Sequence, residues 1–162
     1  MKSIKWFIVC LCVFCLCACS PSMGHFEDGS IELNELVRKI NEKSANGEWE
    51  FPILQEKETA PNIVSTRYAI DLTQVMDGQV YEALLPAQIG EIAFFHMEEG
   101  KEALVKQAIQ HRLKELKKEW GTLIYDAEEL INTCIEGKIG EYYYVMIGRD
   151  AQKVVNYIQD IK

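Results

Sequence analysis

The stretch that decides the fold, residues 91–120, reads EIAFFHMEEGKEALVKQAIQHRLKELKKEW. Its first part, residues 91–97, is mostly aliphatic and aromatic, and this composition predicts a β-strand. From residue 99 to residue 120 the apolar side chains return every three or four positions, which predicts a long amphipathic helix. The apolar face of this helix comprises Leu104, Val105, Ala108, Ile109, Leu113, Leu116 and Trp120.

Two hairpins flank this helix. Residues 79–85 form a strand pattern just before the strand at 91–97, and the short connection between them favours an antiparallel hairpin. Downstream, residues 131–136 and 141–147 predict a second hairpin, with Gly137 and Gly140 flanking its turn.

Further helices are predicted at both ends of this core region. Apolar residues recur at helical spacing from Leu33 until Gly47 ends the pattern. Asp150 is the expected N-cap of a short terminal helix. Residues 48–62 contain two prolines and scattered charges, so we expect a loop there with one turn of helix at most.

The predicted order of elements is therefore α-ββ-α-ββ-α, which belongs to the α+β class. We expect an antiparallel sheet of about four strands packed against helices on one face. Residues 31–162 suit a single domain with one hydrophobic core. Residues 1–18 and 19–30 precede it as a signal peptide and a polar tether.

The N-terminal segment has the layout of a secretory signal. Lys2 and Lys5 precede an uncharged, mostly apolar run at residues 6–18. A helix that spans a bilayer needs roughly 20 residues, so a cleaved signal is favoured over a retained transmembrane anchor. Five of the six cysteines fall within residues 10–19, among apolar neighbours and without a histidine, so they behave as small hydrophobic residues rather than as metal ligands.

The end of this run, Leu16-Cys17-Ala18-Cys19, resembles the lipobox of bacterial lipoproteins. The resemblance implies cleavage between Ala18 and Cys19 and a diacylglyceryl group on the Cys19 sulfur. Two acyl chains hold a protein stably at a membrane, at about 0.8 kcal/mol per buried methylene. We therefore expect a lipid-anchored protein on the extracytoplasmic face of the cell membrane. The alternative is an ordinary secretory signal that is cut nearby.

The expected mature chain is strongly acidic. The whole chain has 17 basic and 25 acidic residues, and removal of residues 1–18 takes away two lysines, which changes the net charge from −8 to 15 − 25 = −10. This charge repels phosphate backbones and anionic lipid headgroups, so we expect no nucleic-acid partner. Cys134 is the other cysteine beyond residue 18, which leaves no disulfide once Cys19 is lipidated. Cys134 is predicted on a strand.

No motif for catalysis, metal binding or phosphate binding occurs in the sequence, so we expect no catalytic residue, no metal and no cofactor. His111, Arg112 and Lys114 are explained by a solvated helix face. The run Tyr142-Tyr143-Tyr144 is more informative, because alternation on a strand places Tyr142 and Tyr144 on one face. They form either an exposed binding surface or part of a central strand covered on both faces.

Several segments together resemble a known family. They are the lipobox, YAID at residues 68–71, the stretch at 89–120, and GEYYYVMIGRDAQKVVNYI at 140–158. They are similar to the small lipoproteins grouped as domain of unknown function 4358, found mainly in Gram-positive bacteria. That family has an EIA(V/F)F strand followed by a helix with a late arginine, matched here by residues 91–95 and Arg112. A GxYV strand and a terminal helix then close the family's domain.

The resemblance covers roughly residues 30–160 and departs from the family pattern in the long connection NGEWEFPILQEKE at residues 46–58. It implies no activity and no functional residue, because the family has no established activity.

The leading hypothesis is a non-enzymatic binding module of the cell envelope, with an envelope protein or a cell-wall fragment as its partner. One alternative is an enzyme whose site is assembled from Arg112, His96, Glu91 and Glu98. Another is a structural subunit of an envelope complex. A deep pocket where those polar groups converge favours the enzyme, and a shallow face favours the binding module. A wide apolar patch favours the structural subunit.

Overall fold

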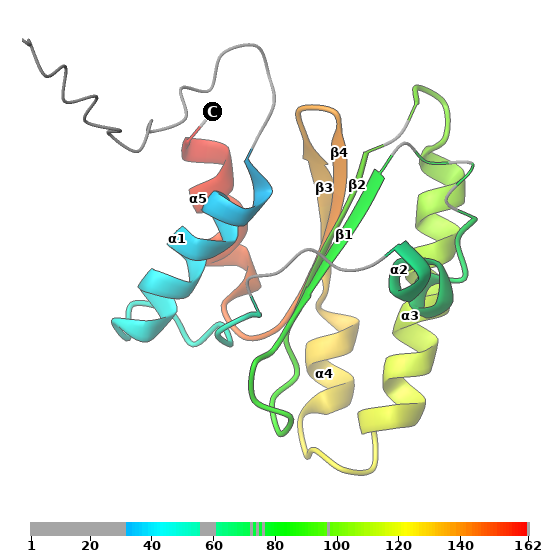
Figure 1. Ribbon diagram of the computed structural model, residues 1–162. Helices are drawn as coiled ribbons and strands as arrows, with labels where there is room; N and C mark the ends of the chain where they lie inside the picture. The colour runs from blue at the N-terminus through cyan, green and yellow to red at the C-terminus, as the bar shows by residue number, and fades with distance from the viewer. Residues whose placement is uncertain are drawn as a thin grey trace, which may run out of the picture.

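A computed structural model describes residues 32–55, 61–71, 73, 75, 77–96 and 98–161. The predicted signal peptide, Ala18, Cys19 and the tether lie outside the described residues. The helices are α1 Leu33–Ala45, α2 Pro61–Tyr68, α3 Glu102–Trp120, α4 Ala127–Asn132 and α5 Ala151–Asp160. The strands are β1 Asp77–Glu82, β2 Glu91–His96, β3 Ile135–Ile139 and β4 Tyr142–Ile147 (Figure 1).

The four strands form one antiparallel sheet in the order β1-β2-β4-β3. The two hairpins meet at β2 and β4, which pair from Glu91 opposite Ile147 to His96 opposite Tyr142. The predicted α+β class and the four-strand antiparallel sheet are confirmed. The element order is α-α-ββ-α-α-ββ-α, because two short helices, α2 and α4, were not predicted.

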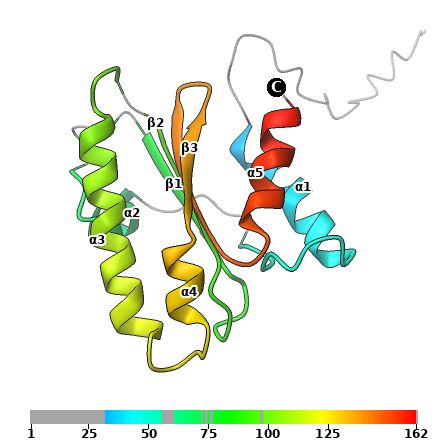
Figure 2. The ribbon, with the colours of Figure 1, turned by 180° about the vertical axis from the view of Figure 1, so that it is seen from behind.

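The prediction of helices on one face is wrong, because both faces of the sheet are covered. Helices α2, α3 and α4 lie on one side, and α1 and α5 lie on the other (Figures 1 and 2). The reason lies in the central strands: five of the six residues in β2 and five of the six in β4 are buried. Strands that are apolar at nearly every position need cover on both faces.

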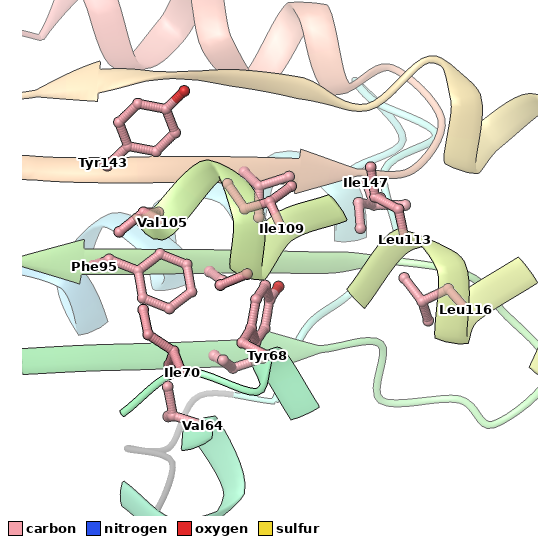
Figure 3. Packing of buried hydrophobic residues seen from close by; sticks show 14 of the residues in the cluster. Val64, Tyr68, Ile70, Phe95, Val105, Ile109, Leu113, Leu116, Tyr143 and Ile147 are labelled. Carbon is pink, nitrogen blue, oxygen red and sulfur yellow. The ribbon is translucent and has the colours of Figure 1, made fainter. Parts of the chain in front are cut away.

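Two clusters of buried side chains result. The α3-side core contains alternate residues of the central strands together with α2, α3 and α4 (Figure 3). The α5-side core contains the other alternate residues together with α1 and α5. The residues of the central strands β2 and β4 in the first cluster are Ala93, Phe95, Tyr143, Val145 and Ile147. Those of the same two strands in the second cluster are Ile92, Phe94, Tyr144 and Met146.

Helix α4 replaces the predicted start of the second hairpin. Ala127 and Ile131 are both buried on it, four residues apart as helical packing requires. Ile131 therefore does not start a strand as predicted, because α4 continues to Asn132 and β3 begins only at Ile135. Cys134 is half-buried between α4 and β3, so its predicted place on a strand is wrong.

Gly137 does not flank the turn as predicted, because it lies within β3 opposite Tyr144. The turn itself is Gly140-Glu141, with Gly140 at φ 54°.

Asp150 is the N-cap residue of α5 as predicted, although its side chain accepts no hydrogen bond from a helix N–H. Its carboxylate accepts hydrogen bonds from the Glu50 backbone N–H at 2.9 Å and from Lys153 Nζ at 2.8 Å. Asp150 therefore ties the start of α5 to the connection after α1.

Candidate functional site

An ion pair is buried between α3 and the sheet. Arg112 of α3 and Glu91 at the start of β2 are only 8% and 3% exposed. Arg112 Nε donates to both carboxylate oxygens of Glu91 at 3.1 Å, and its Nη2 donates to Oε2 at 2.5 Å. The hydroxyl of Tyr68, at the end of α2, donates to Oε1 of the same carboxylate. Three elements therefore meet at one carboxylate.

The expectation that Arg112 lies on the solvated side of its helix is wrong. Position 112 lies four residues after Ala108 and four before Leu116, and all three are buried on one face of α3. Residues four apart share a helix face, so this spacing was the signal that placed Arg112 inward. The partner of Arg112 could not be predicted in the same way, because Glu91 lies on a different element and residue spacing does not pair the two.

The surroundings of this cluster keep Arg112 protonated and the hydroxyl of Tyr68 neutral. Burial, followed by the charge and the hydrogen bond of Glu91, raises the pKa of Tyr68 well above its ordinary value. Burial alone would lower the pKa of Arg112, but its hydrogen bonds and its attraction to Glu91 outweigh this effect and raise the pKa. At neutral pH Tyr68 is therefore a hydroxyl donor and Arg112 a cation.

The ion pair continues outward to a pocket. Glu82, at the end of β1, accepts from Arg112 Nη2 at 3.4 Å and also pairs with Arg67 of α2. The side chains of Arg67 and Glu82 are each one-third exposed. A pocket of about 380 Å³ opens beside them, between the β1–β2 loop and the C-terminal end of α3. Its lining includes Leu84, Leu85 and Trp120.

The structure brings together only two of the four residues considered for an enzyme site. Arg112 and Glu91 are in contact, whereas His96 lies at the opposite end of β2. Five strand steps separate Glu91 from His96, which is about 17 Å. His96 Nε2 is 3.0 Å from Glu141 Oε2, and Glu98 is exposed.

The predicted tyrosine surface is not exposed. Tyr144 is 3% exposed and belongs to the α5-side core, and Tyr142 is half-buried against the same cluster. Tyr143 is buried on the other face of β4. The prediction of a binding surface at Tyr142 and Tyr144 is therefore wrong. The alternative interpretation, in which these residues cover both faces of a central strand, describes the structure.

The exposed apolar side chains lie elsewhere, in loops that sequence reasoning left without a role. Leu84 and Leu85 are 54% and 57% exposed in the β1–β2 loop, and Leu123 and Tyr125 are 72% and 107% exposed in the α3–α4 loop. Both loops lie at the same end of the molecule, away from the start of α1 and the C-terminus (Figures 1 and 2). We call these four residues, with Ile53 beside Leu84, the apolar end.

The signal in the sequence was the pair of leucines before Pro86 and the Leu-x-Tyr pattern after Gly121. Both lie next to turn residues, where apolar side chains have no regular element to pack them.

Among the described residues, no helix combines the length and the hydropathy that crossing a bilayer requires. Comparisons with models of protein families, with curated proteins and with solved structures find no match. The resemblance to the family of small lipoproteins thus stays a prediction.

Proposed function

We propose that this chain is a lipid-anchored binding module of the cell envelope, and that the apolar end and its neighbouring pocket receive the partner. The observation that carries this proposal is the position of the exposed large apolar residues. Within the described part of the chain, Ile53, Leu84, Leu85, Leu123 and Tyr125 are the large hydrophobic residues that are exposed. Exposed apolar side chains that gather at one end of a molecule are typical of an interaction site, whereas scattered single ones are ordinary.

The elements next to the apolar end are held together by ion pairs. The Glu91–Arg112 pair fixes α3 against β2, and Glu82 connects Arg112 to α2 through Arg67. The walls of the pocket therefore belong to elements that are held in place, although the apolar side chains themselves lie on loops. Binding loops on a rigid scaffold are a common arrangement for recognition.

The chemistry of this surface favours a protein or peptide partner over a cell-wall sugar. Leucine side chains and Tyr125 bury apolar area, which apolar residues of a peptide can match. Arg67 and Glu82 at the pocket offer a donor and an acceptor that suit peptide amides and polar side chains.

The position of the apolar end also suits an anchored protein. The described chain begins at α1, on the end of the molecule opposite the apolar loops (Figure 1). A lipid on Cys19 would therefore attach to the membrane through the far end of the domain and leave the apolar end free.

Site-specific photo-crosslinking in intact cells tests the proposal. A photoreactive side chain at Leu85 or Tyr125 should capture the same partner protein, and one at the exposed Gln159 of α5 should not. Leu85→Asp should then abolish capture from position 125 while the melting temperature stays unchanged, because residue 85 is exposed. Equal capture from positions 85, 125 and 159, or capture that Leu85→Asp leaves intact, would contradict a specific site at the apolar end.

The observations favour this function over the two alternatives. The enzyme hypothesis keeps only Glu91 and Arg112, and both oxygens of Glu91 already accept hydrogen bonds. A structural subunit would use the same apolar end, but its partner would remain bound through purification at a fixed stoichiometry. Photo-crosslinking followed by native purification separates a transient partner from a permanent one.

A further inference from the structure

The two edges of the sheet differ. The C-terminal end of the β1 edge is covered by the segment that follows α1. Gln55 N donates to Glu82 O and Leu84 N donates to Ile53 O, both at 2.8 Å. The other edge is β3, which pairs only with β4. In the described part of the chain, no backbone hydrogen bond joins the outer side of β3 to another segment. An unpaired edge is a template for another strand.

The geometry of β3 shows which residues line this edge. The β3–β4 turn is the two-residue loop Gly140-Glu141, with Ile139 opposite Tyr142. The residues that flank such a loop exchange backbone hydrogen bonds, and alternate residues then direct theirs outward. Glu136 and Lys138 are therefore the residues whose backbone N–H and C=O groups face the open edge.

Both of their side chains lie on the α3 side of the sheet. Lys138 pairs with Glu102 of α3, and Glu136 accepts a hydrogen bond from the Tyr143 hydroxyl at 2.9 Å. Between them Gly137 presents no side chain. It lies beneath the ring of Tyr144, on the α5 side.

We propose that β3 pairs with β3 of a second copy of this chain, antiparallel and centred on Gly137. The sequence IEGKI is complementary to itself in this arrangement. Glu136 lies opposite Lys138 of the other copy, and Lys138 opposite its Glu136, on the same face. Ile135 and Ile139 likewise face each other, and the two glycines meet at the centre without side chains.

Charge complementarity is what selects a second copy as the occupant. A lysine on an edge strand ordinarily discourages pairing. Here Glu136 lies two residues before Lys138 on the same face. In antiparallel self-pairing, the lysine of each copy therefore faces the glutamate of the other. Cross-strand pairs of this kind stabilise a sheet, and like charges in the same positions destabilise it. Shifting the register by two residues would place Lys138 opposite Lys138 of the other copy, or Glu136 opposite its Glu136.

The arrangement also suits an anchored protein. A two-fold axis normal to the sheet joins the two sheets into one of eight strands and keeps the α5 side on the same face in both copies. Helix α1 lies on that face (Figures 1 and 2). Both chains therefore enter the dimer on the same face, although at opposite ends of the joined sheet because the second copy is reversed. Two lipid anchors can thus reach one membrane while the two apolar ends point sideways in opposite directions.

A charge-reversal series on the full chain in detergent, with empty micelles in excess, tests the proposal by sedimentation velocity. In Glu136→Lys, positions 136 and 138 are both lysines, so every charged pair between the copies becomes lysine against lysine. In Lys138→Glu, every such pair becomes glutamate against glutamate. Each single variant should self-associate about tenfold more weakly than the wild type. An equimolar mixture of the two variants should form a heterodimer, and the double variant should again form a homodimer.

The mixture separates the proposal from simple misfolding, because two unfolded variants do not restore each other. Glu102→Gln is the matched control: it removes the partner of Lys138 within the chain but leaves the pairs between copies, so it should dimerise. A monomeric wild type, or single variants that dimerise as well as the wild type, would overturn the proposal. A mixture of the two single variants that stays monomeric would overturn it as well.

Discussion

Arg112 is buried on the apolar face of α3, where the buried Glu91 is its nearest counter-charge at 2.5 Å and the one-third exposed Glu82 lies 3.4 Å away. Replacing Arg112 by Met leaves the Glu91 carboxylate buried without a cation. We expect the free energy of unfolding to fall by about 3–5 kcal/mol, the cost of breaking a buried pair on one side. Urea unfolding followed by circular dichroism measures this loss.

The companion experiment removes the whole cluster. In a triple variant with Tyr68→Phe, Glu91→Leu and Arg112→Met, no buried charge or hydroxyl is left unpaired, because the part-exposed Glu82 keeps Arg67 as its partner. Buried pairs replaced by apolar residues of similar size are often neutral in stability. The triple variant should therefore recover most of the loss. A triple variant as unstable as Arg112→Met alone would show that packing, and not the unpaired carboxylate, causes the effect.

Tyr143 links stability to alkaline pH. Burial, the hydrogen bond to Glu136 and the charge of Glu136 raise its pKa to about 12, compared with about 10 in an unfolded chain. The folded pKa is the higher one, so this contribution to stability is complete below pH 10 and is lost as the pH rises toward 12.

Unfolding by urea at a series of pH values should therefore show a decline between pH 10 and pH 12. Tyr143→Phe should make this decline shallower. Part of it should remain, because the pKa of Tyr68 is also raised by burial. Equal slopes in the wild type and the variant would show that Tyr143 ionises as easily in the folded protein as in the unfolded chain.

At the scale of single elements, β3 depends on Gly137. A Cβ atom at this position would lie 2.6 Å from Cζ of Tyr144, whose ring is buried in the α5-side core. The ring would have to tilt out of its packed position, so Gly137→Ala should lower the free energy of unfolding by about 1–3 kcal/mol, the usual cost of overpacking.

A smaller residue opposite position 137 supplies the control. Tyr144→Leu makes room for the added methyl group, so Gly137→Ala should cost less in that background than in the wild type. A double-mutant cycle from thermal or urea unfolding gives the coupling between the two positions. Additive losses would mean that the two side chains do not compete for space.

The long elements could be predicted from the sequence, and the short ones could not. Helix α3 and strand β2 follow from the patterns at residues 91–120, because many residues repeat one period there. Helix α4 has only six residues, and its Ile131 alternates with Thr133 and Ile135 as a strand residue would. Local spacing decides poorly between helix and strand in a segment that short.

The candidate site shows the same limit at a longer range. The position of Arg112 on the apolar face could be counted from its neighbours on α3, but its partner Glu91 is 21 residues away. Their meeting depends on which face of the sheet α3 covers. A strand with one solvated face alternates apolar and polar residues, but β2 and β4 are buried at five of six positions each. This pattern indicates helices on both faces of the sheet, whereas the predicted fold has them on one.

For the whole molecule, the two halves of the chain are not equivalent, although each is a hairpin followed by helix. After β2 the chain passes to α3 on one face, and after β4 it passes to α5 on the other (Figure 1). The first half therefore closes the core that holds the ion pair, and the second half closes the core that holds α1. Helix α1 in turn is where the expected tether joins the domain.

The anchor is the remaining whole-molecule prediction. The chain from residue 19 has a net charge of −10, which opposes attachment to anionic lipids through the protein surface. If the lipid on Cys19 is the anchor, Cys19→Ser should move the protein from the membrane fraction to the soluble fraction. The same variant should lose incorporation of a palmitate analogue fed to the cells.

Cys15→Ser is the matched control, because it makes the same chemical change in the same apolar run but outside Leu16-Cys17-Ala18-Cys19. It should stay in the membrane fraction and keep the label. Retention of Cys19→Ser in the membrane fraction would mean that residues 6–18 hold the chain as an uncleaved segment instead. The domain would then be attached through that segment, and the proposed site of lipidation would be wrong.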